Sequence, residues 1–309
     1  MRKAVIAMLC ILAVGVVLCA AGFAKGGVQP LVFNWNGFKL ERVEDAGEMV
    51  KVDEDFSGEK VKNVVIDLDV MDHVLVTEGD AFTVKGQNLK SYGGLEAKLD
   101  GKTLIVTESV KGWSVDSLLT LGWQDNTECA VTITVPKGFE VNSLEADVNV
   151  ADLRVEKIAA DEARFTSDVG GIEVADVTAK DLTLDAATGD AALTGVEAKN
   201  AEIKTNVGSF RADGLHVRKN LLYEGNIGDS VFTGLVLDKK AEFQVNTGNL
   251  ELGFAMGEDD VEYEIDSDLG DVAVDGRQVD KDYAHSARGA TAKVAISSNI
   301  GNVTLSFEN

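Results

Sequence analysis

Hydrophobic and polar residues alternate through the second half of the chain. From residue 163 onward, apolar side chains recur at every second position on both sides of a glycine, and the positions between them are mostly polar or small. Side chains of a β-strand point alternately to its two faces, so this period of two predicts short strands with one buried face. The residues expected inside are Phe165, Leu184, Ile203, Tyr223, Phe243, Ile265 and Ile296 five positions before the glycine, and Ile172, Ala191, Phe210, Ser230, Leu250, Val272 and Val303 two positions after it.

The same pattern occurs seven times. The glycines of the seven segments are Gly170, Gly189, Gly208, Gly228, Gly248, Gly270 and Gly301, which are 19, 19, 20, 20, 22 and 31 residues apart. Self-similarity at such a period is typical of stacked repeats. A unit of about 20 residues cannot bury its apolar face alone, so each unit is expected to stack on the next, with equivalent residues about 4.8 Å apart.

Each glycine is expected to turn the chain. Asparagine and aspartate tolerate left-handed backbone angles and bond to their own main chain in turns, and glycine adopts a positive φ without steric cost. The unit is therefore a strand, an Asn-x-Gly corner, a second strand and a looser return. The column two residues before the glycine contains Asp168, Asn206, Asn226, Asn246, Asp268 and Asn299, with Ala187 in the remaining repeat.

These patterns predict an all-β fold, a single-chain β-solenoid (β-helix) with regular coils over residues 163–309. Right-handed coils are expected from the general crossover rule. A β-sandwich is the alternative, but it has no reason to keep one corner motif at nearly constant spacing. Residues 61–160 alternate less regularly and are expected to form wider, earlier coils of the same domain, 61–309. Because open solenoid ends aggregate, residues 39–60 and the insertion 276–293, which precedes the last coil, are the candidate caps.

The N-terminus contains an apolar segment. Residues 4–24 hold no charge and follow Arg2 and Lys3. A membrane span needs about 20 apolar residues and the core of a signal peptide about 7–15, so the length favours a transmembrane anchor. The small residues around Ala24 keep cleavage there as the alternative, which would yield a secreted protein. The positive N-terminus predicts a single-pass protein of the cell membrane whose C-terminal domain is extracytoplasmic, with residues 25–60 as a linker or stalk.

The charge excludes one class of partner. The 309 residues carry 29 Lys and Arg against 52 Asp and Glu, a net charge of −23. A polyanion of this size is not expected to bind nucleic acid, and cationic partners or bridging divalent ions are favoured. Two of the three cysteines, Cys10 and Cys19, lie in the apolar segment, so the exported part has only Cys129 and no internal disulfide. Cys129 begins an alternating segment and is expected to be buried.

No catalytic, cofactor-binding or metal-binding residue is assigned from the sequence. His73, His216 and His285 are not spaced as metal ligands, and the glycines match no phosphate-binding loop. Residues 266–271 resemble part of a calcium loop but lack its sixth-position glycine and closing glutamate. No cofactor is expected.

Three aspartates support an alternative. Asp190, Asp229 and Asp271 each follow a corner glycine, and stacked carboxylates can cleave carbohydrates on a solenoid face. In chain order, however, Ser209 and Asn249 separate them, as expected for a solvated column of turns that avoids repulsion between like charges.

The segment VTITVPKGFEVNSLEADVNV at 131–150, followed by coils with the corner x-G-[DGNS], resembles the bacterial putative-adhesin family of β-strand-repeat domains. The resemblance covers roughly residues 61–309. It implies one N-terminal membrane segment joined to a repeating β ectodomain and, for some members, proximity to envelope-stress signalling. The family defines no catalytic residues that could be transferred.

Together these features predict a non-enzymatic, membrane-anchored envelope protein that acts as an interaction or adhesion module. Its expected partners are other envelope proteins or wall polymers, and the membrane through residues 4–24. A carbohydrate-active β-helix enzyme and an accessory protein of an envelope-stress signalling system remain as alternatives.

Overall fold

The computed structural model describes residues 31–34, 39–42, 49–89, 94–108 and 128–308. These residues form β-strands joined by turns, together with one 3-10 turn, η2 (Glu258–Asp260). Strands β1 (Leu31–Asn34) and β2 (Lys39–Arg42) pair only with each other. The predicted anchor, residues 4–24, lies outside the described residues. Within the described residues, no helix is long and apolar enough to cross a membrane.

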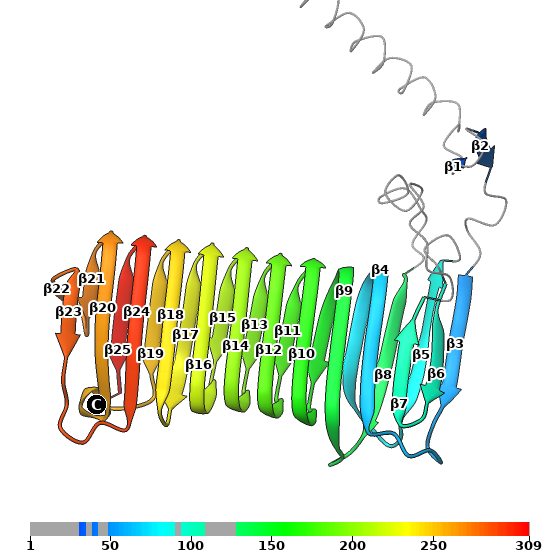
Figure 1. The fold of residues 1–309 in the computed structure, drawn as a ribbon, viewed down its shortest axis with the longest axis horizontal. Coiled ribbons are helices and arrows are strands. Elements are labelled where there is room, and N and C mark those ends of the chain that lie inside the picture. Colours follow the sequence, from blue (N-terminus) through cyan, green and yellow to red (C-terminus); the bar gives the residue numbers. More distant parts are fainter. Residues whose placement is uncertain (1–30, 35–38, 43–48, 90–93, 109–127, 309) are drawn as a thin grey trace, which may run out of the picture.

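The core of the fold is a stack of coils, each made of one long and one short strand joined at a corner (Figure 1). Long strands pair in parallel with long strands, and short strands with short strands, so two sheets run the length of the stack. The register places Phe165, Leu184 and Ile203 side by side on neighbouring strands. The long strands are β10 (Ala159–Val169), β12 (Thr178–Thr188), β14 (Glu197–Val207), β16 (His216–Ile227), β18 (Lys240–Thr247), β20 (Val261–Leu269) and β24 (Ala292–Ile300); the short strands are β11 (Ile172–Ala175), β13 (Ala191–Thr194), β15 (Phe210–Asp213), β17 (Ser230–Leu237), β19 (Leu250–Phe254), β21 (Val272–Val274) and β25 (Val303–Phe307).

The first end of the stack is built differently. Strands β4 (Asn63–Gly79) and β9 (Glu140–Glu156) are long enough to run through both sheets, and they pair in parallel with each other. β4 also pairs in parallel with β7 (Thr103–Thr107) and β8 (Ala130–Pro136). The outermost strands pair antiparallel instead. β6 (Glu96–Asp100) pairs with β7, and β3 (Met49–Asp55) pairs with β5 (Thr83–Leu89). The other edge of β5 pairs antiparallel with β8. The expected wide coils are therefore present only in part: β4 and β9 stack in parallel, whereas β3, β5 and β6 add antiparallel strands.

The other end departs from chain order. The last coil of the sequence, β24 and β25, lies between the coil of β18 and β19 and the coil of β20 and β21 (Figure 1). Residues 276–293, a candidate cap, do cover one end of the stack, but the last coil of the sequence is not the outermost one. The chain leaves one position of the stack empty, forms the outermost coil, and returns to fill the gap. Strands β22 (Arg277–Val279) and β23 (Asp282–His285), which belong to this segment, pair antiparallel with β21 and β20 and cover the outer edge.

The interior matches the predicted columns. All fourteen residues assigned to the inside are at most 3% exposed, including Ser230 at 1%. The alternation shifts once in β10, β12 and β14: in β12 both Ala179 and Leu182 are buried, although they are three residues apart. The predictions of an all-β fold and of parallel stacking are confirmed.

Candidate interaction surfaces

The corner glycines stack directly on one another. All seven have φ between 132° and 148°, a region that favours glycine. The close approach between coils is a second reason for glycine. A Cβ atom on Gly208 would overlap the carbonyl oxygen of Gly189 in the preceding coil, and the other corners have equivalent contacts. Backbone alone fills this line through the stack.

The asparagines before the glycines form a ladder between coils. The Nδ2 of Asn226 donates to Oδ1 of Asn206 at 2.7 Å, and that of Asn246 donates to Oδ1 of Asn226 at 2.7 Å. Asn299 continues the ladder by donating to Asn246 at 2.9 Å, although 53 residues separate them. These amides were expected to bond to their own main chain. In the stack they bond to the equivalent amide one coil away, because parallel coils bring identical side chains together.

A second ladder follows the glycines and includes the aspartates considered for carbohydrate cleavage. Oδ1 of Asp190 accepts a hydrogen bond from the Ser209 N–H at 2.8 Å, and Oδ1 of Asp229 accepts one from the Asn249 N–H at 2.8 Å. At Asp271 the direction is reversed, since its backbone N–H donates to Oδ1 of Asn302 at 2.9 Å. These side chains join coil to coil.

The coil exchange also changes the spacing of these aspartates. Asn249 and Asn302 both lie between Asp229 and Asp271, because the Asn302 N–H donates to Oδ1 of Asn249. The chain-order estimate, with Asn249 as the only separator, is therefore wrong. The carboxylates of Asp229 and Asp271 belong to coils three positions apart, and the stack does not bring these two aspartates into adjacent coils.

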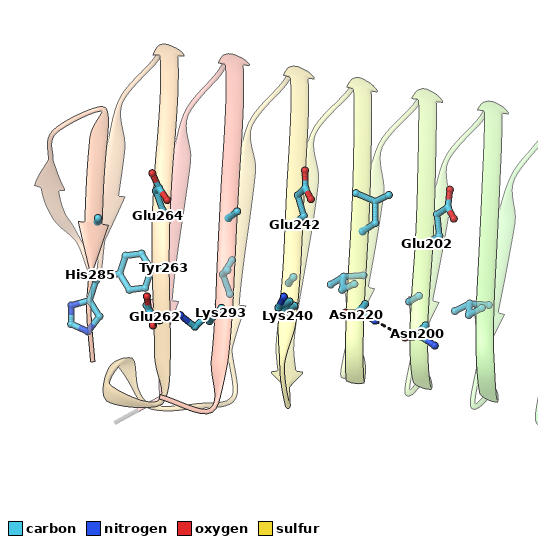
Figure 2. Close-up of a pocket in the computed structure, with 18 of the residues that line it drawn as sticks. Asn200, Glu202, Asn220, Lys240, Glu242, Glu262, Tyr263, Glu264, His285 and Lys293 are labelled. Atoms are coloured by element: carbon cyan, nitrogen blue, oxygen red, sulfur yellow. Dashed lines mark hydrogen bonds and ion pairs between the residues drawn. The ribbon is translucent and has the colours of Figure 1, made fainter. Parts of the chain in front are cut away.

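The outer face of the long-strand sheet holds an open groove of about 930 Å³ (Figure 2). Two rows of side chains line it across neighbouring coils. The first row joins Asn200, Asn220, Lys240, Lys293 and Glu262 in register. Asn220 donates to Asn200 at 2.9 Å, and Nζ of Lys293 lies 3.0 Å from Oε2 of Glu262.

The second row carries Glu202, Leu222, Glu242, Ala295 and Glu264 in the same order. Acidic and apolar side chains therefore alternate along this side of the groove, and Leu222 is only partly covered. Neither row was predicted from the sequence. They stand eight and six residues before each corner glycine, so the repeat would have revealed them if the outward columns had been read like the inward ones.

The three histidines lie apart from one another beside carboxylates. Nε2 of His216 is 3.1 Å from Oδ1 of Asp238, and Nε2 of His73 is 3.8 Å from Oε1 of Glu128. His285 stacks on the Tyr263 ring, with centroids 5.0 Å apart. Within the described residues, no three His, Cys, Asp or Glu side chains are grouped as a metal site, and residues 266–271 form none.

Glu258 contacts the outermost coil and both strands that cover it, β22 and β23. Its Oε1 accepts the Tyr263 hydroxyl at 2.8 Å and lies 3.9 Å from Nδ1 of His285, and its Oε2 lies 3.6 Å from Arg277. Burial, followed by the bond to Glu258, raises the pKa of the Tyr263 hydroxyl, so it stays protonated as a donor. The cluster is a structural joint between β20 and the strands that cover it.

One carboxyl group is buried near the first end. Glu108 is 4% exposed and accepts the backbone N–H of Asp69. Burial raises the pKa of Glu108 to about 7, and the nearby Asp69 and Asp67 add to the effect. Asn149 donates to Oδ1 of Asp69 at 2.6 Å, which ties β9 to the same place. Cys129 is 3% exposed, which confirms its prediction as a small buried residue.

Comparison with known families identifies this architecture. The family model described as Toastrack DUF4097 matches residues 61–306, most of the chain. The chain belongs to this toastrack family. The matched range begins just before β4 and ends within β25, so it covers the coil stack.

Three solved structures resemble the toastrack chain. A putative adhesin from Bacteroides fragilis NCTC 9343 is 12% identical, with a TM-score of 0.47, over 84% of this chain and 98% of that one. A putative lipid binding protein from Parabacteroides distasonis ATCC 8503 is 14% identical, with a TM-score of 0.43, over 85% and 98%. A putative cell adhesion protein from Clostridium sporogenes ATCC 15579 is 10% identical, with a TM-score of 0.31, over 84% and 99%. Similarities this distant carry no argument about function. A search of curated proteins gave no match.

Proposed function

We propose that this toastrack protein is a non-enzymatic envelope protein that acts as an interaction or adhesion module. Residues 4–24 anchor it in the cell membrane, and the coil stack lies outside the cytoplasm. Its partners are other envelope proteins or wall polymers. The alternatives are release after cleavage near Ala24 and a role beside an envelope-stress sensor.

The groove of the long-strand sheet carries this proposal. It lies on the outer face of the sheet, and its side chains stand in register from coil to coil in two rows. One row carries amide and ammonium groups and a carboxylate, and in the other row carboxylates alternate with the partly covered Leu222 and the exposed Ala295. Such a surface suits an extended partner that lies across several coils and makes similar contacts at each, as repeat proteins commonly bind.

Photo-cross-linking in intact cells tests the proposal. A photoreactive amino acid would replace Leu222 or Ala295 in the groove, and Thr304 on the opposite short-strand sheet would be the matched control position. We expect both groove positions, and not Thr304, to cross-link to the same envelope protein or wall polymer. Equal capture from both faces, or none from the groove, would contradict the proposed surface.

The same samples test the anchor. Recovery of a peptide that begins at Met1 from the membrane fraction supports an anchored protein. A soluble product cleaved after Ala24 would overturn the anchor and favour a secreted module.

Enzymatic activity has a separate test. We expect the full chain to release no product from isolated wall polymers. Turnover that is lost in the combined variant Asp190→Asn, Asp229→Asn and Asp271→Asn, with the fold retained, would replace the module with a carbohydrate-active enzyme.

A further inference from the structure

The two long edges of the coil stack differ in charge and polarity. One edge, here called the corner edge, contains the corners at residues 168–171, 187–190, 206–209, 226–229, 246–249, 268–271 and 299–302. These corners contain several aspartates and neither lysine nor arginine. The opposite edge lies at the start of the long strands, since the corners lie at their ends (Figure 1).

The corner edge also carries a row of exposed aliphatic side chains. Val169, Val207, Ile227, Ile300 and Leu269 are 41–60% exposed, and each directly precedes a corner glycine. Apart from Phe139, they are the large hydrophobic side chains of the described residues that stand clearly exposed. Register joins Val207 to Ile227 directly and joins Ile300 to Leu269, with Thr188 and Thr247 at the remaining places. From Val169 to Leu269 the row is roughly 29 Å long at ordinary strand spacing. A row of exposed aliphatic side chains, interrupted only by two threonines, is a candidate contact surface.

The opposite edge, here called the basic edge, carries a row of cations. Every coil from β12 to β24 contributes at least one: Lys180, Lys199, Arg218 with Lys219, Lys239 with Lys240, and Lys293. All are exposed, and the row is roughly 19 Å long. Three of the cations are paired with carboxylates: Lys180 with Asp161 and Glu140, Arg218 with Glu197 at 2.8 Å, and Lys293 with Glu262 at 3.0 Å.

Other cations of the basic edge face one another. Lys240 pairs in register with Lys293. Lys219 and Lys239 also lie on adjacent coils, because the residues that follow them, Asn220 and Lys240, are paired. Lys199, Lys219, Lys239 and Lys240 form no ion pair within the part of the chain that the structure describes. Like charges on neighbouring strands repel each other, so an opposing anionic surface would relieve this row.

We propose that the corner edge of one molecule binds the basic edge of a second copy, side by side. Both rows follow the same coil stack and therefore have the same spacing, so contacts made at one coil repeat at the next. Lysine stems pack over aliphatic side chains while their ammonium groups reach carboxylates, which fits the row from Val207 to Ile300 beside Asp190 and Asp229. The contact is heterologous and leaves one edge of each kind free, so it can continue into a lateral array.

Two edge variants of the full chain test this contact by light scattering in detergent micelles. The corner variant Val207→Lys/Ile227→Lys and the basic variant Lys199→Glu/Lys219→Glu/Lys239→Glu change exposed positions only. We expect the wild type to form oligomers that dissociate as salt rises, and each variant alone to be monomeric. An equimolar mixture should form dimers, because the intact basic edge of the corner variant binds the intact corner edge of the basic variant. These dimers should grow no further, because both of their free edges are altered.

The matched control is Lys51→Glu/Arg164→Glu/Arg211→Glu, which makes the same charge change at exposed mid-strand positions. It should associate like the wild type. A monomeric wild type, a mixture without dimers, or equal loss in the control would overturn the proposal. Monomeric wild type that binds polyphosphate, with binding lost only in the basic variant, would reassign the basic edge to an anionic polymer.

Discussion

At the scale of single residues, the corner glycine decides how closely two coils can approach. Its φ near 140° and the neighbouring carbonyl oxygen both act against a side chain. Gly101 has a left-handed backbone, with φ 62°, and no atom within 4 Å of the place of a Cβ. Gly101 is therefore a reference for a glycine with positive φ that no neighbouring coil crowds.

We expect Gly208→Ala to lower the free energy of unfolding by about 3 kcal/mol or more, since the new methyl group must push two coils apart. Gly101→Ala should cost about 1–2 kcal/mol, the ordinary penalty of a left-handed backbone. Urea denaturation of the full chain measures both. Equal losses would show that the backbone angle alone selects glycine at the corner.

Glu108 makes stability depend on pH. Its pKa is about 7 in the folded protein against 4.5 for an ordinary glutamate, so folding favours the protonated form. This contribution is complete below pH 4.5 and is lost as the pH rises through 7. The variant Glu108→Gln keeps an acceptor for the Asp69 N–H without the charge, and it should be more stable than the wild type by about 2–3 kcal/mol at pH 8.

The difference between Glu108→Gln and the wild type should nearly vanish at pH 4. Thermal unfolding at several pH values measures it. Glu96→Gln, which changes a less buried carboxylate of the adjacent β6, is the control and should show little change at either pH. A constant difference at all pH values would show that Glu108 is not the titrating group.

At the scale of strands, aromatic side chains link neighbouring coils. Phe232 of β17 lies 5.1 Å from Phe210, 5.2 Å from Tyr223 and 5.1 Å from Phe243, measured between ring centroids. These residues come from β15 to β18, so one ring contacts three other strands. Tyr223 also bonds Ser230 at 2.6 Å and Thr205 at 3.1 Å, which satisfies its buried hydroxyl.

Removing this ring should weaken several coils together. Phe232→Ala is expected to cost about 3–5 kcal/mol, the usual range for a buried phenylalanine. Phe232→Leu retains most of the apolar volume and should cost less than half as much. Urea denaturation with circular dichroism measures the loss. Equal effects of the two variants would mean that ring contacts, and not filled volume, stabilise this region.

At the scale of the whole molecule, the two ends of the stack are closed by antiparallel strands. β22 and β23 cover β21 and β20 at one end, and β3, β5 and β6 form the other. Uncovered sheet edges pair with other chains, so these antiparallel strands keep the parallel stack from growing by addition of further strands. Lateral contact between the corner and basic edges leaves both covers in place.

Replacing Arg277–His285 with a Gly-Ser linker should expose β20 and β21 and cause aggregation that increases with concentration. A lysine at Ala273 on β21 should restore solubility in the shortened chain, since a charge on an edge strand blocks pairing. Light scattering against concentration measures both effects. A shortened chain that remains monomeric would show that β22 and β23 are not needed as a cover.

The sequence determined the local structure of the protein. Alternation assigned the buried side of each strand, from Phe165 to Val303, and the repeat predicted parallel stacking, because both depend on residues close together in the chain. The glycine and asparagine columns followed from the same spacing, although the bonds of Asn226 run to other coils and not to its own main chain.

Only the tertiary structure decided which coils are neighbours. The seven repeats share one pattern and can exchange places. No local signal therefore places Asn299 beside Asn246, or places two coils between Asp229 and Asp271. The groove between Asn200 and Glu262 and the rows of side chains along the two edges also depend on that order. They arise from side chains about 20 residues or more apart, which stacking alone brings into line.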